Sequence, residues 1–359
     1  MKKVVVGLSG GVDSSVTVYL LKKQGYEVIG VTMQIPKEGN SDAVEEGYNK
    51  DILDANSIAD YLGIKTYVVD KRKEFDEIVI KYFIDSYNNG RTPNPCIMCN
   101  PMIKWNALME VADKVGADYV ATGHYANVVK LPNGRYTLLN AKNEKKDQTY
   151  ALFRLSQEQL ARTIMPLGNF ESKDQIREIA KEAGIIVADK KDSQDMCFIP
   201  DGRYANYIRK RTGKRAVPGN ILLQDGTVVG RHKGIIFYTV GQRKGIKLDL
   251  GRKMFVKDIR PESDEVVIAP IDDLYRTDVI ADNINYMAID SIPKDLRAFA
   301  KIRYSHEGAY CTANITEDGL LKCTFDSPQR AITKGQGLVL YDDEGHILCG
   351  GEIIAGGET

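Results

Sequence analysis

The chain has 359 residues, which is too long for a single hydrophobic core and predicts two or three domains. Hydrophobic residues make up 43% and charged residues 27%, as is typical of a globular protein in water. No apolar run approaches the ~20 residues of a membrane span, and no cleavable signal precedes the first strand pattern. We therefore expect a cytoplasmic protein with no membrane partner, in which the six cysteines serve catalysis or metal binding rather than structural disulfides.

The formal net charge of zero conceals a strong segregation of charge along the chain. Between Arg203 and Lys257 there are fourteen Lys and Arg residues but two acids, Asp225 and Asp249. This stretch carries +12 and the remainder −12. A basic module on an otherwise acidic chain predicts a polyanionic partner, and nucleic acid is the partner we expect.

The chain opens with an apolar run at Val4–Val6, a glycine-rich turn, and then an apolar helical pattern. We interpret residues 4–15 as strand, tight loop and helix, with Asp13 and Ser14 as helix-capping residues. The glycines let main-chain N–H groups surround an anion, to which the helix adds its positive end. No Gly-Lys-Ser/Thr follows, so this is not a phosphoryl-transfer P-loop. It resembles the pyrophosphate loop of the ATP-pyrophosphatases, which cleave ATP to AMP and pyrophosphate while adenylating an oxygen.

Strand and helix patterns alternate through the first part of the chain. We predict strands at 27–33, 64–69 and 117–121, helices at 51–62, 75–87 and 103–115, and loops at 34–50 and 88–101. Such alternation predicts an α/β fold with a parallel sheet and helices on both faces. Because ligands bind at the carboxyl ends of such strands, Met33 and Thr122-Gly123-His124 should meet the pyrophosphate loop there.

The rest of the chain changes from mixed to β-rich character. A hairpin at 128–139, helices at 156–162 and 173–183, and a polar loop at 189–200 precede short β runs from about residue 212. We see two β modules that divide near 271–278. The predicted domains are a catalytic α/β domain at 1–205, a basic central β domain at 206–273 that binds nucleic acid, and a C-terminal β-barrel at 274–359.

The six cysteines fall into two groups. Cys311, Cys323 and Cys349 lie in β patterns, where small buried hydrophobic side chains are expected. Cys96 and Cys99 form a Cys-x-x-Cys on one predicted polar loop, and Cys197 lies on another. Thiols in such loops beside an ATP site favour redox, metal or catalytic roles.

Six motifs together identify a family resemblance. They are Gly7–Ser14, Arg91-Thr-Pro-Asn-Pro-Cys-Ile-Met-Cys-Asn, Ala121-Thr-Gly-His-Tyr, Lys146-Asp-Gln, Asp192-Ser-x-x-Met-Cys-Phe-Ile and Tyr238-Thr-x-Gly-Gln-Arg-Lys-Gly. In this order they resemble the bacterial tRNA-specific 2-thiouridylase family (MnmA type) over nearly the whole chain. The combination is far more specific than the first loop alone.

The resemblance implies 2-thiolation of the wobble uridine, U34, in tRNAs for Lys, Glu and Gln. ATP, with Mg²⁺, adenylates the C2 oxygen of the uridine, and Asp13 is expected to order the loop and the ion. A persulfide on Cys197, loaded by a cysteine desulfurase or a sulfur-relay protein, supplies the sulfur. Cys99 is the nucleophile, and a Cys99–Cys197 disulfide closes the cycle. We expect a monomer.

The resemblance also assigns binding residues. For ATP these are Gly7, Leu8, Ser9, Gly10, Gly11, Val12, Asp13, Ser14, Met33 and Gly123. For the target base they are Asn94, Pro95 and Cys96. For tRNA they are His124, Lys146, Asp147, Gln148, Arg303, Tyr304 and Gln336.

Two positions depart from the family pattern, and three alternative functions stay open. Cys96 stands where well-known members have Asp, and Trp105 where they have Phe. Another ATP-pyrophosphatase, either an amidating enzyme or one like tRNA lysidine synthetase, would need no cysteine pair. A tRNA-binding or sulfur-carrier protein would show no turnover. A third alternative keeps the thiolation but uses a [4Fe–4S] cluster held by Cys96, Cys99 and Cys197.

Overall fold

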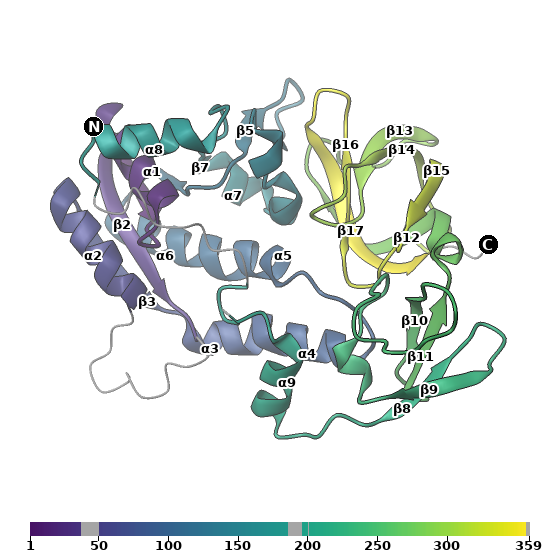
Figure 1. The fold of residues 1–359 in the computed structure, drawn as a ribbon. Coiled ribbons are helices and arrows are strands. Elements are labelled where there is room, and N and C mark those ends of the chain that lie inside the picture. Colours follow the sequence, from purple (N-terminus) through teal and green to yellow (C-terminus); the bar gives the residue numbers. More distant parts are fainter. Residues whose placement is uncertain (37–49, 186–195, 200, 357–359) are drawn as a thin grey trace. The chain divides into compact units, whose positions relative to one another are not determined.

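The structure is a computed structural model that describes residues 1–36, 50–185, 196–199 and 201–356 (Figure 1). It divides into two compact units, each built from separate stretches of chain. The first unit comprises Met1–Val79, Cys96–Gly202 and Glu344–Ile347; the second comprises Ile80–Pro95, Arg203–Asp343 and Leu348–Thr359. The division of the sequence into three consecutive domains stays a prediction. Within the described residues, no helix is long and apolar enough to cross a membrane.

The first unit contains a five-stranded parallel sheet, as the sequence predicted. Its order is β3-β2-β1-β4-β7. The strands are β1 (Lys3–Gly7), β2 (Glu27–Gln34), β3 (Lys65–Asp70), β4 (Tyr119–Ala121) and β7 (Thr163–Ile164). Val4, Val5 and Val6 of the central strand are fully buried, because helices cover both faces of the sheet.

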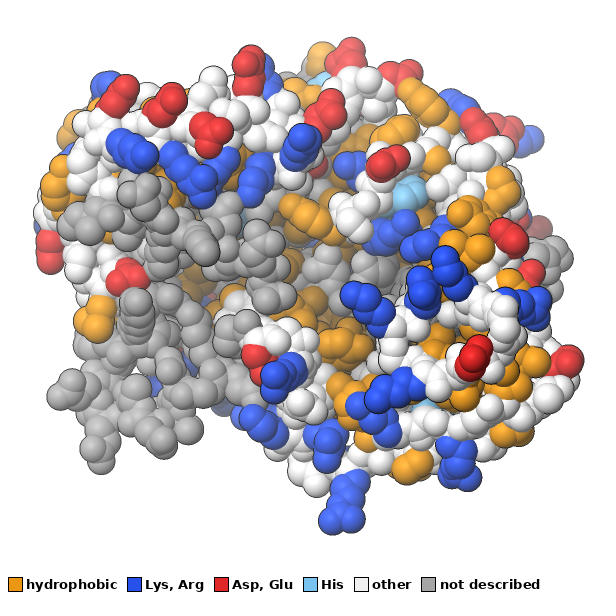
Figure 2. Space-filling view, in the orientation of Figure 1, with side chains coloured by type: hydrophobic (Ala, Val, Ile, Leu, Met, Phe, Trp, Pro, Cys, Tyr) orange, Lys and Arg blue, Asp and Glu red, His pale blue; other side chains and the backbone are white. Residues whose placement is uncertain are grey.

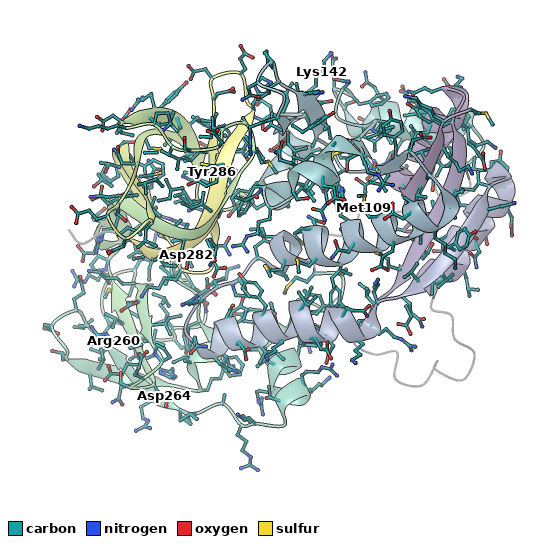
Figure 3. The ribbon with its side chains drawn as sticks, turned by 180° about the vertical axis from the view of Figure 1, so that it is seen from behind. Met109, Lys142, Arg260, Asp264, Asp282 and Tyr286 are labelled. Carbon is teal, nitrogen blue, oxygen red and sulfur yellow. The ribbon has the colours of Figure 1, made fainter. Side chains whose placement is uncertain are left out.

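Helices α1 (Val12–Lys23), α2 (Lys50–Leu62) and α8 (Lys173–Glu182) pack on one face of this sheet. Helix α6 (Asn106–Val115) packs on the other, and Figure 3 shows it from behind, with Met109 labelled. Val4 and Val6 join the core of the first face, whereas a Cβ on Gly7 would lie 3.7 Å from the Leu108 side chain of α6. The prediction of helices on both faces is confirmed.

The predicted loop at 88–101 is wrong over its second half. Helix α4 (Lys81–Asn88) ends at the expected place, but α5 (Pro95–Cys99) begins soon after it. A π-helical segment, Asn100–Trp105, then runs directly into α6. Proline is tolerated at the first position of a helix, which explains Pro95. Pro101 lies at the start of the π-helical segment, where the regular α-helical pattern is interrupted and the hydrogen bond that proline cannot donate is already disturbed.

The predicted hairpin at 128–139 and helix at 156–162 are confirmed with small shifts of their bounds, whereas the predicted polar loop at 189–200 falls largely outside the described residues. A hairpin of β5 (Asn127–Lys130) and β6 (Tyr136–Leu139) precedes α7 (Gln157–Ala161). The stretch Glu344–Ile347 pairs with this hairpin. Thr137 donates from Oγ1 to the Ile347 carbonyl over 2.6 Å, and the Asn140 N–H donates to the Gly345 carbonyl over 3.0 Å. These residues near the end of the chain therefore complete the first unit.

The second unit is β-rich, as predicted, and also carries α4 and α9 (Tyr204–Thr212). A four-stranded sheet has the order β10-β11-β8-β9, and Figure 3 labels Arg260 and Asp264 at its β10–β11 turn. Its strands are β8 (Gly219–Leu222), β9 (Val228–His232), β10 (Phe255–Arg260) and β11 (Glu265–Ala269). Among the described strand pairs of this sheet, β8 and β11 are parallel and the other pairs are antiparallel.

A closed six-stranded antiparallel barrel follows, in the order β12-β15-β14-β13-β16-β17. Its strands are β12 (Tyr275–Tyr286), β13 (Leu296–Lys301), β14 (Ala309–Ile315), β15 (Leu321–Arg330), β16 (Gly337–Tyr341) and β17 (Ile347–Gly356). Cys311, Cys323 and Cys349 are fully buried in it. They serve as small core side chains, as their β patterns predicted. The predicted C-terminal barrel is confirmed.

Candidate active site

The loop after β1 is held together by its own serines. Ser14 accepts at Oγ from the Ser9 N–H over 3.2 Å and donates to the Gly11 carbonyl over 3.1 Å. Gly10 has a φ of 69°, a conformation that favours glycine. The predicted capping role of Asp13 and Ser14 is wrong, because α1 begins at Val12 with Gly11 as its N-cap and no capping side chain. The N–H groups of the first turn stay available to an anion.

The same loop is fixed to the neighbouring strand β2. The Leu8 N–H donates to the Val31 carbonyl over 2.8 Å, and Thr32 donates from Oγ1 to the Leu8 carbonyl over 2.9 Å. Met33 follows at the carboxyl end of β2. This is the edge of the sheet where nucleotides bind in such folds. The predicted loop at 34–50, expected to lie over the site, falls largely outside the described residues.

The segment after β4 packs directly against the start of α1. A Cβ on Gly123 would lie 2.9 Å from both the Asp13 carbonyl carbon and the Ser14 nitrogen. Any side chain there would collide with main-chain atoms, which cannot rotate away. The structure thus brings Gly123 to the glycine-rich loop, as the sequence predicted.

Asp13 makes contacts that the sequence analysis missed. Lys173, the first residue of α8, donates from Nζ to both carboxylate oxygens of Asp13, over 2.6 and 2.7 Å. The Tyr125 hydroxyl donates to Oδ1 over 2.8 Å. Tyr125 belongs to a motif that the sequence had singled out, but Lys173 lies 160 positions from Asp13. No local pattern could have paired them.

His124 is half-buried rather than displayed on the surface. A 2.8 Å hydrogen bond joins its Nδ1 to the Thr122 hydroxyl, and its ring centroid lies 5.6 Å from that of Trp105. Burial, with a smaller contribution from the Lys104 ammonium, holds the pKa of His124 well below its usual range. The imidazole is therefore neutral at physiological pH. Trp105 is fully buried and donates from Nε1 to the Thr163 hydroxyl over 2.8 Å.

Cys99 differs from the expectation that it lies on a polar loop. It is the last residue of α5 and only 7% exposed, and burial raises the pKa of its thiol to about 12. The Lys104 ammonium opposes this shift, while Cys197 and Cys96 add to it. Cys96 and Cys197 are both exposed and both act electrostatically on Cys99. In this state Cys99 is a protonated thiol and hence a poor nucleophile.

Two side chains beside Cys99 hold its helix in place. Asn100 donates from Nδ2 to the Ala151 carbonyl over 2.8 Å, and an Arg154 N–H points to the Met98 sulfur over 3.4 Å. Among the described residues, no three His, Cys, Asp or Glu side chains are grouped as a metal ion would require. Within the described ranges, Cys96, Cys99 and Cys197 do not form such a group.

Two residues predicted to contact tRNA make internal hydrogen bonds. Asp147 accepts from the Ala141 N–H over 2.9 Å and from the Thr149 hydroxyl over 2.6 Å. Gln148 accepts at Oε1 from the Tyr125 N–H over 2.9 Å, and its own N–H donates to the Tyr125 carbonyl. Gln148 therefore fixes the segment that reaches Asp13. Lys146 precedes them on the same short turn and is partly exposed.

The second unit carries the other predicted nucleic-acid residues. Gln336 donates from Nε2 to the Thr92 carbonyl over 2.7 Å, just before Asn94 in the chain. Arg303 donates to the Arg330 carbonyl over 3.0 Å, and Tyr304 is 48% exposed. Figure 2 shows Lys and Arg side chains gathered over α9 and the four-stranded sheet. In α9 the exposed residues Arg209, Lys210 and Arg211 form a consecutive basic turn, which we call the α9 basic turn.

Three family models match successive parts of the chain. Residues 2–201 match the model described as tRNA methyl transferase HUP domain. Residues 205–270 match the tRNA methyl transferase PRC-barrel domain, and residues 276–354 the aminomethyltransferase beta-barrel domain. Among solved structures, an NMN synthetase from Francisella tularensis aligns with 60% of this chain and 78% of its own, at 18% identity and a TM-score of 0.34.

Curated relatives match from end to end. A protein named tRNA-specific 2-thiouridylase MnmA from Lachnoclostridium phytofermentans is 49% identical over 99% of both chains. Proteins of the same name from Clostridium perfringens and Clostridioides difficile are 49% and 48% identical, each over 98% of both chains. With its parallel sheet, glycine-rich loop and C-terminal barrel, the chain belongs to the tRNA-specific 2-thiouridylase family.

Proposed function

We propose that this protein uses ATP to replace the C2 oxygen of the wobble uridine, U34, with sulfur in tRNAs for Lys, Glu and Gln. The observation that carries the proposal is the presence of Cys96, Cys99 and Cys197 in the unit that also holds the glycine-rich loop, with Cys96 and Cys197 both acting on the pKa of Cys99. An ATP-pyrophosphatase that only amidates would not need these thiols. A sulfur carrier would not need the loop.

The first step activates the base. The C2 oxygen attacks the α-phosphorus of ATP, and pyrophosphate leaves. Residues 7–14 present main-chain N–H groups and the amino end of α1 to the phosphates. Asp13 is the carboxylate of the loop, and carboxylate oxygens are ligands that Mg²⁺ accepts, so it is the residue that would hold the ion. Mg²⁺ would neutralise the phosphate charge as pyrophosphate departs.

The second step transfers sulfur from Cys197 to the activated base. The terminal sulfur of a Cys197 persulfide attacks C2, and AMP leaves with the former C2 oxygen. The Cys99 thiolate then attacks the Cys197 sulfur, which breaks the sulfur–sulfur bond and leaves the terminal sulfur on C2 as the thiocarbonyl. The product is a Cys99–Cys197 disulfide, which a dithiol reductant must reduce before the next cycle. A desulfurase or a sulfur-relay protein would then reload Cys197.

This scheme requires Cys99 to lose its proton. In the structure burial raises the pKa of Cys99 to about 12, and the Lys104 ammonium is the group that opposes the shift. Closure of a substrate complex would have to strengthen the Lys104 interaction or supply another positive charge. A buried nucleophile that ionises only in the complete complex would be protected from oxidation between turnovers.

Binding of tRNA is assigned to the basic second unit, with Arg303 and Tyr304 on the barrel, and to His124 and Lys146–Gln148 in the first. Asn94, Pro95 and Cys96 are assigned to the target base. Cys96 could serve there as a proton donor or acceptor in place of the family's aspartate.

Mass spectrometry of nucleosides tests the proposal. Protein, ATP, Mg²⁺, a sulfur donor and each tRNA should yield 2-thiouridine, AMP and pyrophosphate in equal amounts. Cys99→Ala and Cys197→Ala should each abolish thiouridine. Full activity in both variants would support an amidating or lysidine-forming enzyme instead. Iron in anaerobically purified protein that is lost in Cys96→Ala would support the cluster route.

A further inference from the structure

The pairing of Asp13 with Lys173 is the best-defined charge interaction at the glycine-rich loop. The Lys173 ammonium contacts both oxygens of one carboxylate, and the side chains of Lys173 and Asp13 are only 10% and 32% exposed. Tyr125, itself 3% exposed, adds a third hydrogen bond to the same carboxylate. A pair this enclosed is held more firmly than a surface ion pair.

Helix stability does not explain why a lysine stands at this position. Lys173 is the first residue of α8, where the helix dipole disfavours a positive charge. The Ser172–Gln175 capping box fixes this end of the helix without help from Lys173. The ammonium is instead placed beside Asp13, in the first turn of α1.

The same contacts conflict with the role of Asp13 in ATP use. Both carboxylate oxygens already accept from Lys173, and Oδ1 also accepts from Tyr125. An ammonium and a divalent cation cannot both occupy this face of the carboxylate, because they repel each other at such distances. Mg²⁺ can reach Asp13 only if the ammonium moves.

We propose that Lys173 is an exchangeable counter-ion of the ATP site. Without nucleotide it neutralises Asp13; when ATP·Mg²⁺ enters, its ammonium transfers to the nucleotide phosphates and Asp13 passes to the metal ion. The inference rests on the proposed use of ATP and adds a phosphate-binding residue that sequence motifs did not single out. It also assigns Tyr125 the task of keeping the carboxylate in place during the exchange.

The exchange has an unusual signature, because removing Lys173 should affect two ligands in opposite directions. A divalent ion alone should bind more tightly, since its competitor for Asp13 is gone. An ATP analogue should bind more weakly, since a phosphate contact is lost. A residue that merely supported the fold would weaken both.

Binding measurements on the full chain test this without turnover. Mn²⁺ alone is followed by electron paramagnetic resonance, and a non-hydrolysable ATP analogue with Mg²⁺ by equilibrium dialysis. In Lys173→Met and Lys173→Gln we expect Mn²⁺ to bind about tenfold more tightly and the analogue about tenfold more weakly, as the loss of one charged contact implies. Lys181→Met, on the exposed last turn of the same helix, is the matched control and should change neither.

Unchanged binding of both ligands, or weaker binding of both in folded Lys173→Gln, would overturn the exchange. Circular dichroism and thermal unfolding establish that the variants are folded. If the unaltered protein binds Mn²⁺ but no ATP analogue, the proposed function fails instead. If it binds the analogue and the variants do so equally well, Lys173 is not a phosphate ligand although ATP use stands.

Discussion

Gln336 donates from its side chain to the Thr92 carbonyl over 2.7 Å, joining positions that are 244 residues apart. In the same unit the Thr92 N–H donates to the Lys334 carbonyl over 2.9 Å, and Arg91 and Glu352 form an ion pair at 3.5 Å. The barrel thus holds the residues just before Asn94 and Pro95. Gln336 has an anchoring role in the structure that is separate from its predicted contact with tRNA.

Gln336→Ala should therefore lower the thiolation rate at saturating tRNA by about three- to tenfold, the worth of one hydrogen bond. The affinity for tRNA should change less. Single-turnover kinetics and filter binding separate the two quantities. Lys334→Ala is the control, because it alters an exposed neighbour but keeps the main-chain bond to Thr92. A loss confined to tRNA affinity would favour a direct contact.

Asp13→Ala should abolish pyrophosphate release and leave tRNA binding nearly intact. The carboxylate lies in the first turn of α1, which belongs to the first unit, whereas the basic stretch belongs to the second. A pyrophosphate assay and a gel-shift titration measure the two effects. Asp174→Asn, an exposed acid at the start of α8, should behave like the unaltered protein. Normal turnover by the Asp13 variant would refute its role.

Gly123→Ala should weaken nucleotide binding by more than about tenfold. Its methyl group would press on main-chain atoms of Asp13 and Ser14 at 2.9 Å. The collision displaces the first turn of α1, where the phosphates are expected. Equilibrium dialysis with an ATP analogue measures the loss. Gly356→Ala, where the nearest atoms are 3.5 Å away, is a control that should bind nucleotide normally.

Neutralising the α9 basic turn, Arg209, Lys210 and Arg211, should weaken tRNA binding and flatten its dependence on salt. Each lost phosphate contact should reduce the slope of log affinity against log salt by about 0.7–0.9. Filter binding over a series of salt concentrations measures the slope. An unchanged slope would mean that these exposed side chains do not meet the nucleic acid.

Alkaline pH should destabilise the barrel through Cys349. Burial, with a smaller contribution from Cys311, raises the pKa of this thiol to about 12, above its ordinary value of 9.0. The buried, protonated thiol therefore makes its full contribution to the free energy of unfolding below about pH 9. This contribution falls as the thiol of the unfolded chain ionises, and it is lost above about pH 12. At about pH 10 the loss is about 1.4 kcal/mol. The free energy of unfolding, measured in urea at about pH 8 and about pH 10, should fall between the two pH values in the unaltered protein. In Cys349→Ala this fall should be smaller by that amount.

Much of the fold could be predicted from patterns within short stretches of the sequence. The run Val4–Val6 and the glycines after it are sufficient to indicate a strand and an anion-binding loop, because the signal lies within a short stretch of chain. The segment 95–101 was misassigned because its two prolines suggest a loop, whereas a helix start and a π-helical segment tolerate them. The two-residue strand β7 is too short to leave a pattern.

Those parts of the site that a sequence motif defines could be predicted. The parts that depend on contacts between distant residues could not. Gly123 was expected at the loop and lies there. The burial of Cys99 was missed, because the prolines around it suggested a loop and the sequence does not reveal what packs on its helix. Lys173 was missed because its partner is 160 positions away. The resemblance supplied residue roles, and these stay predictions until tested.

The stretch Glu344–Ile347 has a consequence for how the protein is made. Ribosomes deliver the chain from its amino end, so the first unit must wait for its last stretch until almost the whole barrel sequence has been synthesised. Until then the hairpin of β5 and β6 lacks the partners that Gly345 and Ile347 provide. A nascent chain arrested before residue 344 would hold an incomplete first unit, and no single cut of the gene could release both units whole.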